Sequence, residues 1–174
     1  MFEVLPNWHP IFVHFSIALF VIAAMLYVVH FVLPQSSWAA PILTAARINL
    51  WLGAVLSIAT VAAGMQAFLT VQHGAEQQPV INDHRNWALA TAVLWWSIAL
   101  WEGWRSRHSK PMSYFFLAAV LCALAPLAAT GWKGAELVYR HGIGVNRLAL
   151  VERISHLLPN DATHKRLLDR IDTK

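Results

Sequence analysis

Cysteine and charged residues are both scarce in this chain of 174 residues. Cys122 is the single cysteine, which excludes an internal disulfide and the CxxCH motif that attaches a c-type heme. Charged residues make up 13% of the sequence, whereas a soluble domain carries about 25%. Because the hydrophobic share is 57%, this shortage of charge indicates an integral membrane protein.

Several motifs that would indicate catalysis are also missing. The sequence contains no Gly-x-Ser-x-Gly, no His-Glu-x-x-His and no phosphate-binding glycine loop. We also expect the apolar runs to lack the buried carboxylates of many ion-coupled transporters. The net charge is +4, but no basic run alternates with aromatic residues. Lysines and arginines beside a membrane explain this charge, and we expect no nucleic-acid partner.

Long apolar runs are what the chain has in quantity. The first covers 23 residues, which as a helix reach about 35 Å and exceed a hydrocarbon core of about 30 Å. This pattern predicts an all-α fold, an integral membrane four-helix bundle in residues 1–144. The expected spans are 11–33, 42–71, 84–104 and 112–139. Pro126 should kink the fourth.

The remaining residues, 145–174, are polar and have apolar residues at helical spacing. We interpret them as an amphipathic helical tail that lies on the membrane surface or against a partner.

Tryptophans and positive charges indicate how the bundle sits in the membrane. Six tryptophans fall near the ends of the runs, as in the aromatic belts of membrane proteins: Trp8, Trp87, Trp132, Trp38, Trp101 and Trp104. Four basic residues lie at the end away from most histidines: Arg47, Arg105, Arg107 and Lys110. They favour that end as cytoplasmic and the histidine end as periplasmic in a bacterial inner membrane, although the basic tail favours the reverse.

Histidines occur where the apolar runs begin or end. Alternating helix direction places five of them on one side: His9, His14, His73, His84 and His141. A single interfacial histidine is as often only solvated or hydrogen-bonded. Four helices that each bring a histidine to one face, however, resemble the way bundles build cofactor sites. Neutral imidazole binds iron, copper and zinc, so we predict a redox centre, with heme b as the first candidate.

The individual histidines differ in what they predict. His14, His84 and His141 are the leading ligands, and His73 is a weaker one. His9 precedes Pro10, and we expect it to serve mainly in capping or at the interface.

Charged residues next to His141 offer a second set of candidates. Lys133, Glu136 and Arg140 are spaced to form a ladder along one helix face. The ladder is either an interfacial ion-pair set or a functional group of residues. In the second case Arg140 or Lys133 meets heme propionates, and Glu136 supports a ligand or carries protons. A non-heme copper, zinc or iron site is the alternative, built from His14, His84 and His141 with Glu136 or His9.

Two segments and one histidine resemble a known family. Residues 9–19 (HPIFVHFSIAL), His84 and residues 131–145 (GWKGAELVYRHGIGV) are similar to the bacterial four-helix membrane family named domain of unknown function 2231. The resemblance covers roughly residues 8–145 and matches His14, His84 and His141. Ser16 stands where the family usually has proline, and Lys133 where it usually has an apolar or small residue. Fusions of some relatives to Rieske or c-type cytochrome domains imply a place near electron transfer.

These observations favour a membrane protein that carries heme b. It would relay electrons between the quinol pool and a periplasmic redox partner, such as a Rieske protein or a c-type cytochrome. The alternatives are the non-heme metal protein and a non-catalytic accessory subunit of a larger respiratory complex.

Overall fold

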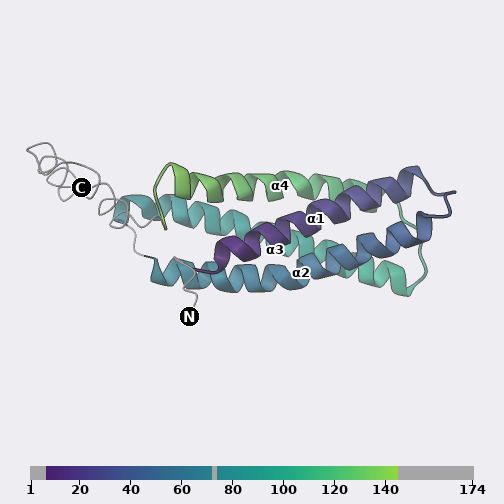
Figure 1. The fold of residues 1–174 in the computed structure, drawn as a ribbon, viewed down its shortest axis with the longest axis horizontal. Helices are drawn as coiled ribbons and strands as arrows, with labels where there is room; N and C mark the ends of the chain where they lie inside the picture. The colour runs from purple at the N-terminus through teal and green to yellow at the C-terminus, as the bar shows by residue number, and fades with distance from the viewer. Residues whose placement is uncertain (1–6, 72–73, 145–174) are drawn as a thin grey trace, which may run out of the picture. The chain divides into compact units, whose positions relative to one another are not determined.

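Four long helices make up almost all of the part of the chain that the computed structural model describes, residues 7–71 and 74–144 (Figure 1). They are α1 (His9–Val32), α2 (Ala39–Thr70), α3 (Gln78–Arg107) and α4 (Tyr114–Tyr139), with the 3₁₀ turn η1 (Ala75–Gln77) before α3. No strand occurs in these residues. The predicted all-α fold is confirmed, and the predicted tail lies outside the described residues.

Local sequence explains where the helices begin. Pro10 and Pro79 stand in the first turns of α1 and α3, where the missing N–H removes no helical hydrogen bond. Ser113 caps α4, because its Oγ accepts a hydrogen bond from the backbone N–H of Phe116 at 3.2 Å. The helix α4 continues through Pro126, whose carbonyl accepts a hydrogen bond from Thr130 Oγ1 at 2.8 Å.

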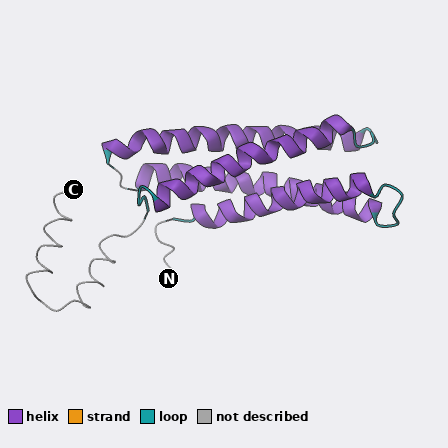
Figure 2. Ribbon diagram, turned by 90° about the horizontal axis from the view of Figure 1, so that it is seen from above, coloured by secondary structure: helices purple, strands orange, loops and turns teal. Residues whose placement is uncertain are grey.

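The bundle consists of two helical hairpins. The most extensive contacts join α1 to α2 and α3 to α4, whereas α2–α3 and α1–α4 are smaller. The order around the bundle is therefore α1, α2, α3, α4, with α1 diagonal to α3 and α2 diagonal to α4. Figure 2 shows the helices running side by side along the bundle.

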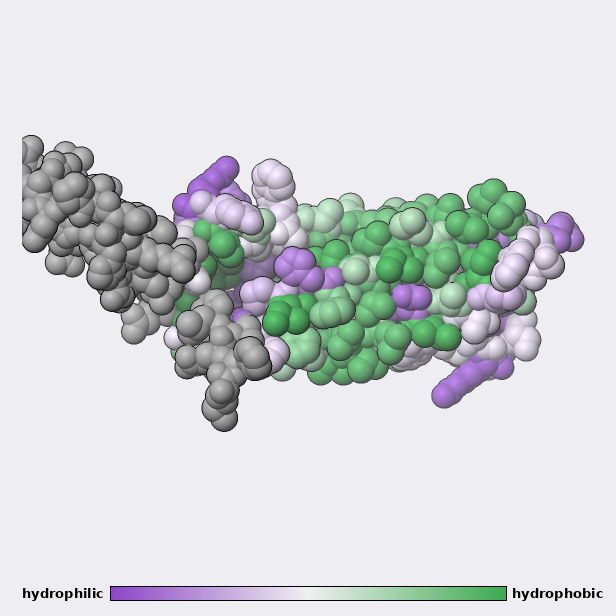
Figure 3. Space-filling view, in the orientation of Figure 1, coloured by the Kyte–Doolittle hydropathy of each residue, from purple (hydrophilic) through white to green (hydrophobic). Residues whose placement is uncertain are grey.

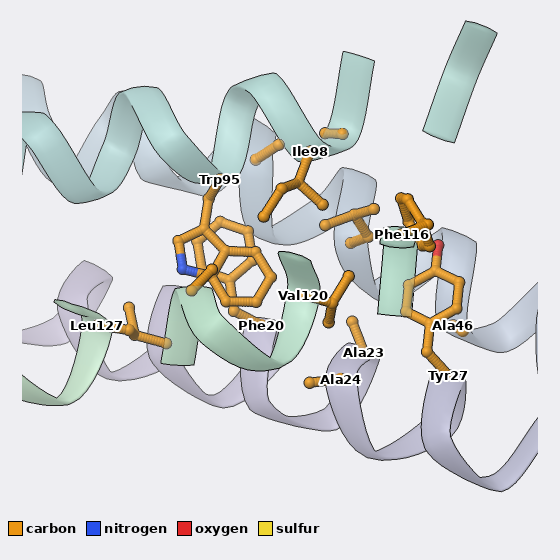
Figure 4. Packing of buried hydrophobic residues seen from close by; sticks show 14 residues of the cluster. Phe20, Ala23, Ala24, Tyr27, Ala46, Trp95, Ile98, Phe116, Val120 and Leu127 are labelled. Atoms are coloured by element: carbon orange, nitrogen blue, oxygen red, sulfur yellow. The ribbon is translucent and has the colours of Figure 1, made fainter. Parts of the chain in front are cut away.

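The core combines four large aromatic side chains (Phe20, Tyr27, Trp95 and Phe116) with many small ones (Figure 4). Phe20 of α1 stacks on Trp95 of α3, with ring centroids 4.3 Å apart. Small residues let the helix backbones approach each other around this stack. The buried ones include Ala23, Ala24, Ala46, Ala54, Ala99 and Ala123. At Gly53 of α2 a Cβ atom would lie 2.9 Å from the Phe20 ring, so only glycine fits there.

The outer surface of the bundle is apolar. Figure 3 shows hydrophobic residues across the middle of one face, with hydrophilic residues gathered toward the ends. Large exposed side chains such as Val32, Leu69, Val93 and Phe115 belong to this surface. A soluble protein rarely exposes so continuous an apolar area, but lipid tails can cover it.

Among the helices of the described residues, three have the length and composition to cross a membrane: α1, α2 and α4. The helix α3, which contains the expected third span, does not meet the same criterion in composition. Its charged residues are concentrated near its two ends: Asp83, Arg85, Glu102, Arg105 and Arg107. Because α3 packs against α2 and α4 along the same bundle, the difference lies in composition and not in position.

The Phe20–Trp95 stack yields a test of the core. We expect Phe20→Ala to lower the free energy of unfolding by about 3–5 kcal/mol, because the ring is 2% exposed and its removal leaves a cavity. Phe15→Ala is the matched control on the same helix, since that ring is 59% exposed. Thermal unfolding in detergent, followed by far-ultraviolet circular dichroism, measures both. Equal losses for the two variants would contradict the core described above.

Candidate histidine site

Two histidines on diagonal helices meet at one end of the bundle. His9 is the first residue of α1, and His84 lies in the second turn of α3. Their side chains are close enough to interact electrostatically. Both are half-buried, and both lie near the end of the bundle and not at its middle.

A backbone carbonyl of α2 orients the His9 ring. His9 Nδ1 lies 3.0 Å from the Thr60 carbonyl oxygen, and a carbonyl can only accept, so Nδ1 carries the proton and donates it. The neutral ring then has its lone pair on Nε2. Thr60 is itself held to α1, because its hydroxyl lies 2.8 Å from Ser16 Oγ. A carbonyl that fixes the tautomer in this way is typical of metal-binding histidines.

His84 has a nitrogen with no partner. Its Nδ1 is buried and makes no hydrogen bond with the described part of the chain. Electrostatic interactions with the ring come from His9, Asp83 and Lys133, and the Thr130 backbone offers it a hydrogen-bonding group. A buried polar atom normally has a partner, and either the Thr130 backbone or a ligand can fill that role for this nitrogen.

Glycines make room for both imidazoles. A Cβ at Gly64 of α2 would lie 2.8 Å from His9 Cε1, and one at Gly134 of α4 would lie 3.1 Å from His84 Cε1. Going around the bundle, α1 contributes His9, α2 contributes Gly64, α3 contributes His84 and α4 contributes Gly134. Gly64 thus leaves the space that the His9 ring occupies.

The other predicted histidines lie apart from this pair. His14 is exposed, and its Nδ1 donates to the Pro10 carbonyl of its own helix. His141 follows the end of α4, and its carbonyl accepts a hydrogen bond from Gln77 Nε2 at 3.1 Å. His73 lies outside the described residues. Within residues 7–71 and 74–144, no three His, Cys, Asp or Glu side chains come together as a metal site. The three-histidine ligand set, with Glu136 or His9, is thus not assembled here and stays a prediction.

The charged residues near His141 pair differently from the predicted ladder. Arg140 does bond to Glu136 across one helical turn. Lys133 instead reaches across to Asp83 of α3, the residue before His84, and lies over the Trp87 ring at 5.7 Å. The prediction that Lys133 belongs to a ladder along α4 was wrong, because the nearest carboxylate is on the neighbouring helix. This ion pair joins α3 to α4 beside the histidine pair.

A second polar cluster, at the opposite end of the bundle, was missed. Glu102 of α3 is fully buried, which corrects the expectation that the spans lack buried carboxylates. Its Oε1 accepts from Arg47 Nε of α2 at 2.6 Å, and its Oε2 accepts from Arg105 Nε at 2.9 Å. The sequence did contain a signal, since Glu102 is the one acidic residue between Trp101 and Trp104 and precedes Arg105 by three positions.

Comparisons with known proteins add one match. A family model described as "Predicted membrane protein (DUF2231)" matches residues 6–147. Neither a curated protein nor a solved structure matches the chain.

The close approach of Gly64 to His9 is testable. We expect Gly64→Ala to lower the free energy of unfolding by about 1–3 kcal/mol and to break the bond from His9 Nδ1 to Thr60, because the new methyl group displaces the ring. Nitrogen-15 spectra of labelled histidine report the bond, and thermal unfolding reports the stability. Gly131→Ala is the control, since its nearest neighbour would be Ile17 Cδ1 at 3.7 Å. An unchanged His9 signal in Gly64→Ala would refute this arrangement.

The buried carboxylate gives a second test. Glu102→Leu leaves the Arg105 guanidinium, which is 3% exposed, without its anion, so we expect a loss of about 3 kcal/mol or more in the free energy of unfolding. The exposed Glu76→Leu should change it by no more than about 0.5 kcal/mol. Thermal or denaturant unfolding in detergent compares them. A Glu102→Leu protein as stable as Glu76→Leu would mean that the carboxylate does not hold the cluster.

Proposed function

Because this chain belongs to the family of predicted membrane proteins designated DUF2231, we propose that it is a membrane electron-transfer protein that holds one heme b between His9 and His84. The observation that carries the proposal is the pair of imidazoles brought together from diagonal helices. The sequence favoured His14 and His141 as partners of His84. The proposal now assigns that place to His9.

The number and position of the histidines suit this cofactor. A low-spin heme takes two imidazoles, one on each face, and bundles supply them from facing helices. His9 and His84 provide one each from α1 and α3. A non-heme metal ion usually needs three or more protein ligands, and the described residues do not gather them.

The surroundings of both rings support a ligand role. The Thr60 carbonyl holds His9 with its Nε2 lone pair free. His84 has a buried Nδ1 with no partner. The glycines of α2 and α4 allow both rings to lie inside the bundle. These three features answer separate requirements: a defined tautomer, an available nitrogen and space.

Nearby cations complete the site. Heme supplies one-electron transfer, and its propionates carry negative charge. Lys133 lies beside His84, and Arg140 is largely exposed just past the end of α4. In this proposal Arg140 or Lys133 would meet the propionates, in place of or beside the carboxylates with which they pair, Glu136 and Asp83. The apolar core around Phe20 and Trp95 excludes water from the inner side of the site.

The position of the pair near one end of the bundle suits exchange with a soluble or peripheral partner. We propose that this end is periplasmic, because the short basic segment Arg105–Lys110 lies at the other end. The partner would be a one-electron carrier such as a Rieske protein or a c-type cytochrome, and the donor a membrane quinol.

Absorption spectra of the histidine variants test the proposal. The purified protein should show a Soret band that sharpens with a distinct alpha band on reduction by dithionite, at about one heme per chain. His9→Ala and His84→Ala should each lose or shift these bands, because each removes an axial ligand. His14→Ala and His141→Ala should keep them, and His156→Ala, in the polar segment 145–174, serves as a control.

Two outcomes would contradict the proposal in different ways. A folded, colourless preparation from heme-replete cells would refute heme binding, and metal analysis of the same sample would detect a non-heme ion. A spectrum lost in His14→Ala or His141→Ala but kept in His9→Ala would preserve the function and refute the ligand pair.

A further inference from the structure

The cluster around Glu102 carries more positive than negative charge. Two guanidinium groups, from Arg47 and Arg105, share one carboxylate. The described groups that interact with the neighbouring Tyr27 are these same three, so they leave a net charge of +1. Uncompensated charge at the edge of a hydrocarbon core is costly, and an anion would offset it.

The inner half of the cluster is closed. Arg105 is almost fully buried, its Nη1 donates to the Lys110 carbonyl at 3.2 Å, and its guanidinium lies over the Phe116 ring at 4.7 Å. Tyr27 is fully buried beside it, with a hydroxyl that has no hydrogen-bond partner among the described residues. This side of the cluster is therefore shielded from the surroundings.

The outer half is open through Arg47. Its side chain is 33% exposed, and its Nε is committed to Glu102. Among the described residues, no acceptor bonds to its two Nη groups. A guanidinium held by one nitrogen and open at the others can bind a phosphate with two parallel hydrogen bonds.

A shallow, open apolar groove begins at the aliphatic stem of Arg47 and follows the outer face of α2. Its volume is about 310 Å³, and it is lined by Arg47, Ile48, Trp51, Leu52 and Val55. From Arg47 to Val55 the groove follows α2 for about 12 Å toward the middle of the bundle. The Trp51 ring packs against α3 at Gly103, because a Cβ atom built at Gly103 would lie 3.0 Å from Trp51 Cζ2. A cation at one end of an apolar groove matches the two parts of a phospholipid.

We propose that this groove binds one anionic phospholipid, with the headgroup phosphate on Arg47 and the start of an acyl chain against Trp51, Leu52 and Val55. The net +1 charge of the cluster selects an anionic lipid over a zwitterionic one, because only the anionic lipid neutralises it. The site lies at the end opposite to the histidine pair and does not depend on the proposed heme.

Native mass spectrometry of the full-length protein tests the site. The protein in mild detergent is mixed with equal amounts of phosphatidylglycerol and phosphatidylcholine of the same acyl chains. We expect one retained phosphatidylglycerol, favoured by at least about tenfold over phosphatidylcholine. Arg47→Gln should abolish this preference. Arg107→Gln, which removes an exposed cation at the end of α3, should leave it unchanged.

A second variant keeps the test decisive if Arg47→Gln fails to fold. Val55→Trp fills the groove at an exposed position and leaves the Arg47–Glu102 contact intact, so it should lose the bound lipid. Equal retention of both lipids by the unaltered protein would overturn the proposal. So would an unchanged preference in Arg47→Gln or Val55→Trp, or a quinone in place of the phospholipid.

Discussion

The absence of water from the middle of the bundle is the constraint on which the rest of the structure depends. A polar group there is stabilised by a partner within the protein, and among the described side chains there Trp95 Nε1 is an exception. The hydroxyls of Thr91 and Thr130 therefore bond to each other at 2.9 Å, and Trp96 Nε1 donates to Ser57 Oγ at 2.8 Å. Between these contacts the core is apolar and is closed by the Phe20–Trp95 stack. Ionisable side chains lie toward the two ends of the bundle, where other side chains or lipid headgroups can form ion pairs and hydrogen bonds with them.

The same constraint sets the distance between the two polar clusters. Eighteen residues separate His9 from Tyr27 along α1, and eighteen separate His84 from Glu102 along α3. In a helix that spacing is about 27 Å, close to the thickness of a hydrocarbon core of about 30 Å. The histidine pair and the Glu102 cluster therefore mark the two edges of the apolar layer. One edge holds neutral imidazoles, and the other holds a charged network.

The fold was readable from the sequence, but the partners of its polar residues were not. Long apolar runs predict helices because length and hydropathy are local properties, and His84 is a candidate from its place at the start of the third run. For His9 the neighbouring Pro10 suggested a capping or interfacial residue. In fact the helix begins at His9, and Gly64, fifty-five residues away, makes space for its ring.

For Lys133 and Glu102, too, the sequence did not reveal the partner on another helix. Lys133 was assigned to the ladder on its own helix, but its carboxylate partner is on α3. The burial of Glu102 follows from Arg47 on another helix, which no local pattern reveals. Spacing along one helix predicts contacts within that helix. Contacts between helices depend on the order and rotation of the helices in the bundle.

The division of the bundle into two hairpins has a consequence for how the histidine pair forms. The α1–α2 hairpin contains His9 and its glycine, and the α3–α4 hairpin contains His84 and its glycine. Each hairpin can thus position one imidazole by itself, but neither can bring the two together. A slip of one hairpin past the other by a single helical turn, about 5.4 Å, would part the rings while leaving each against its own glycine. A ligand that bridges both imidazoles would hold the hairpins in register, and it would act as a cross-link between two halves that otherwise share the smaller contacts of the bundle.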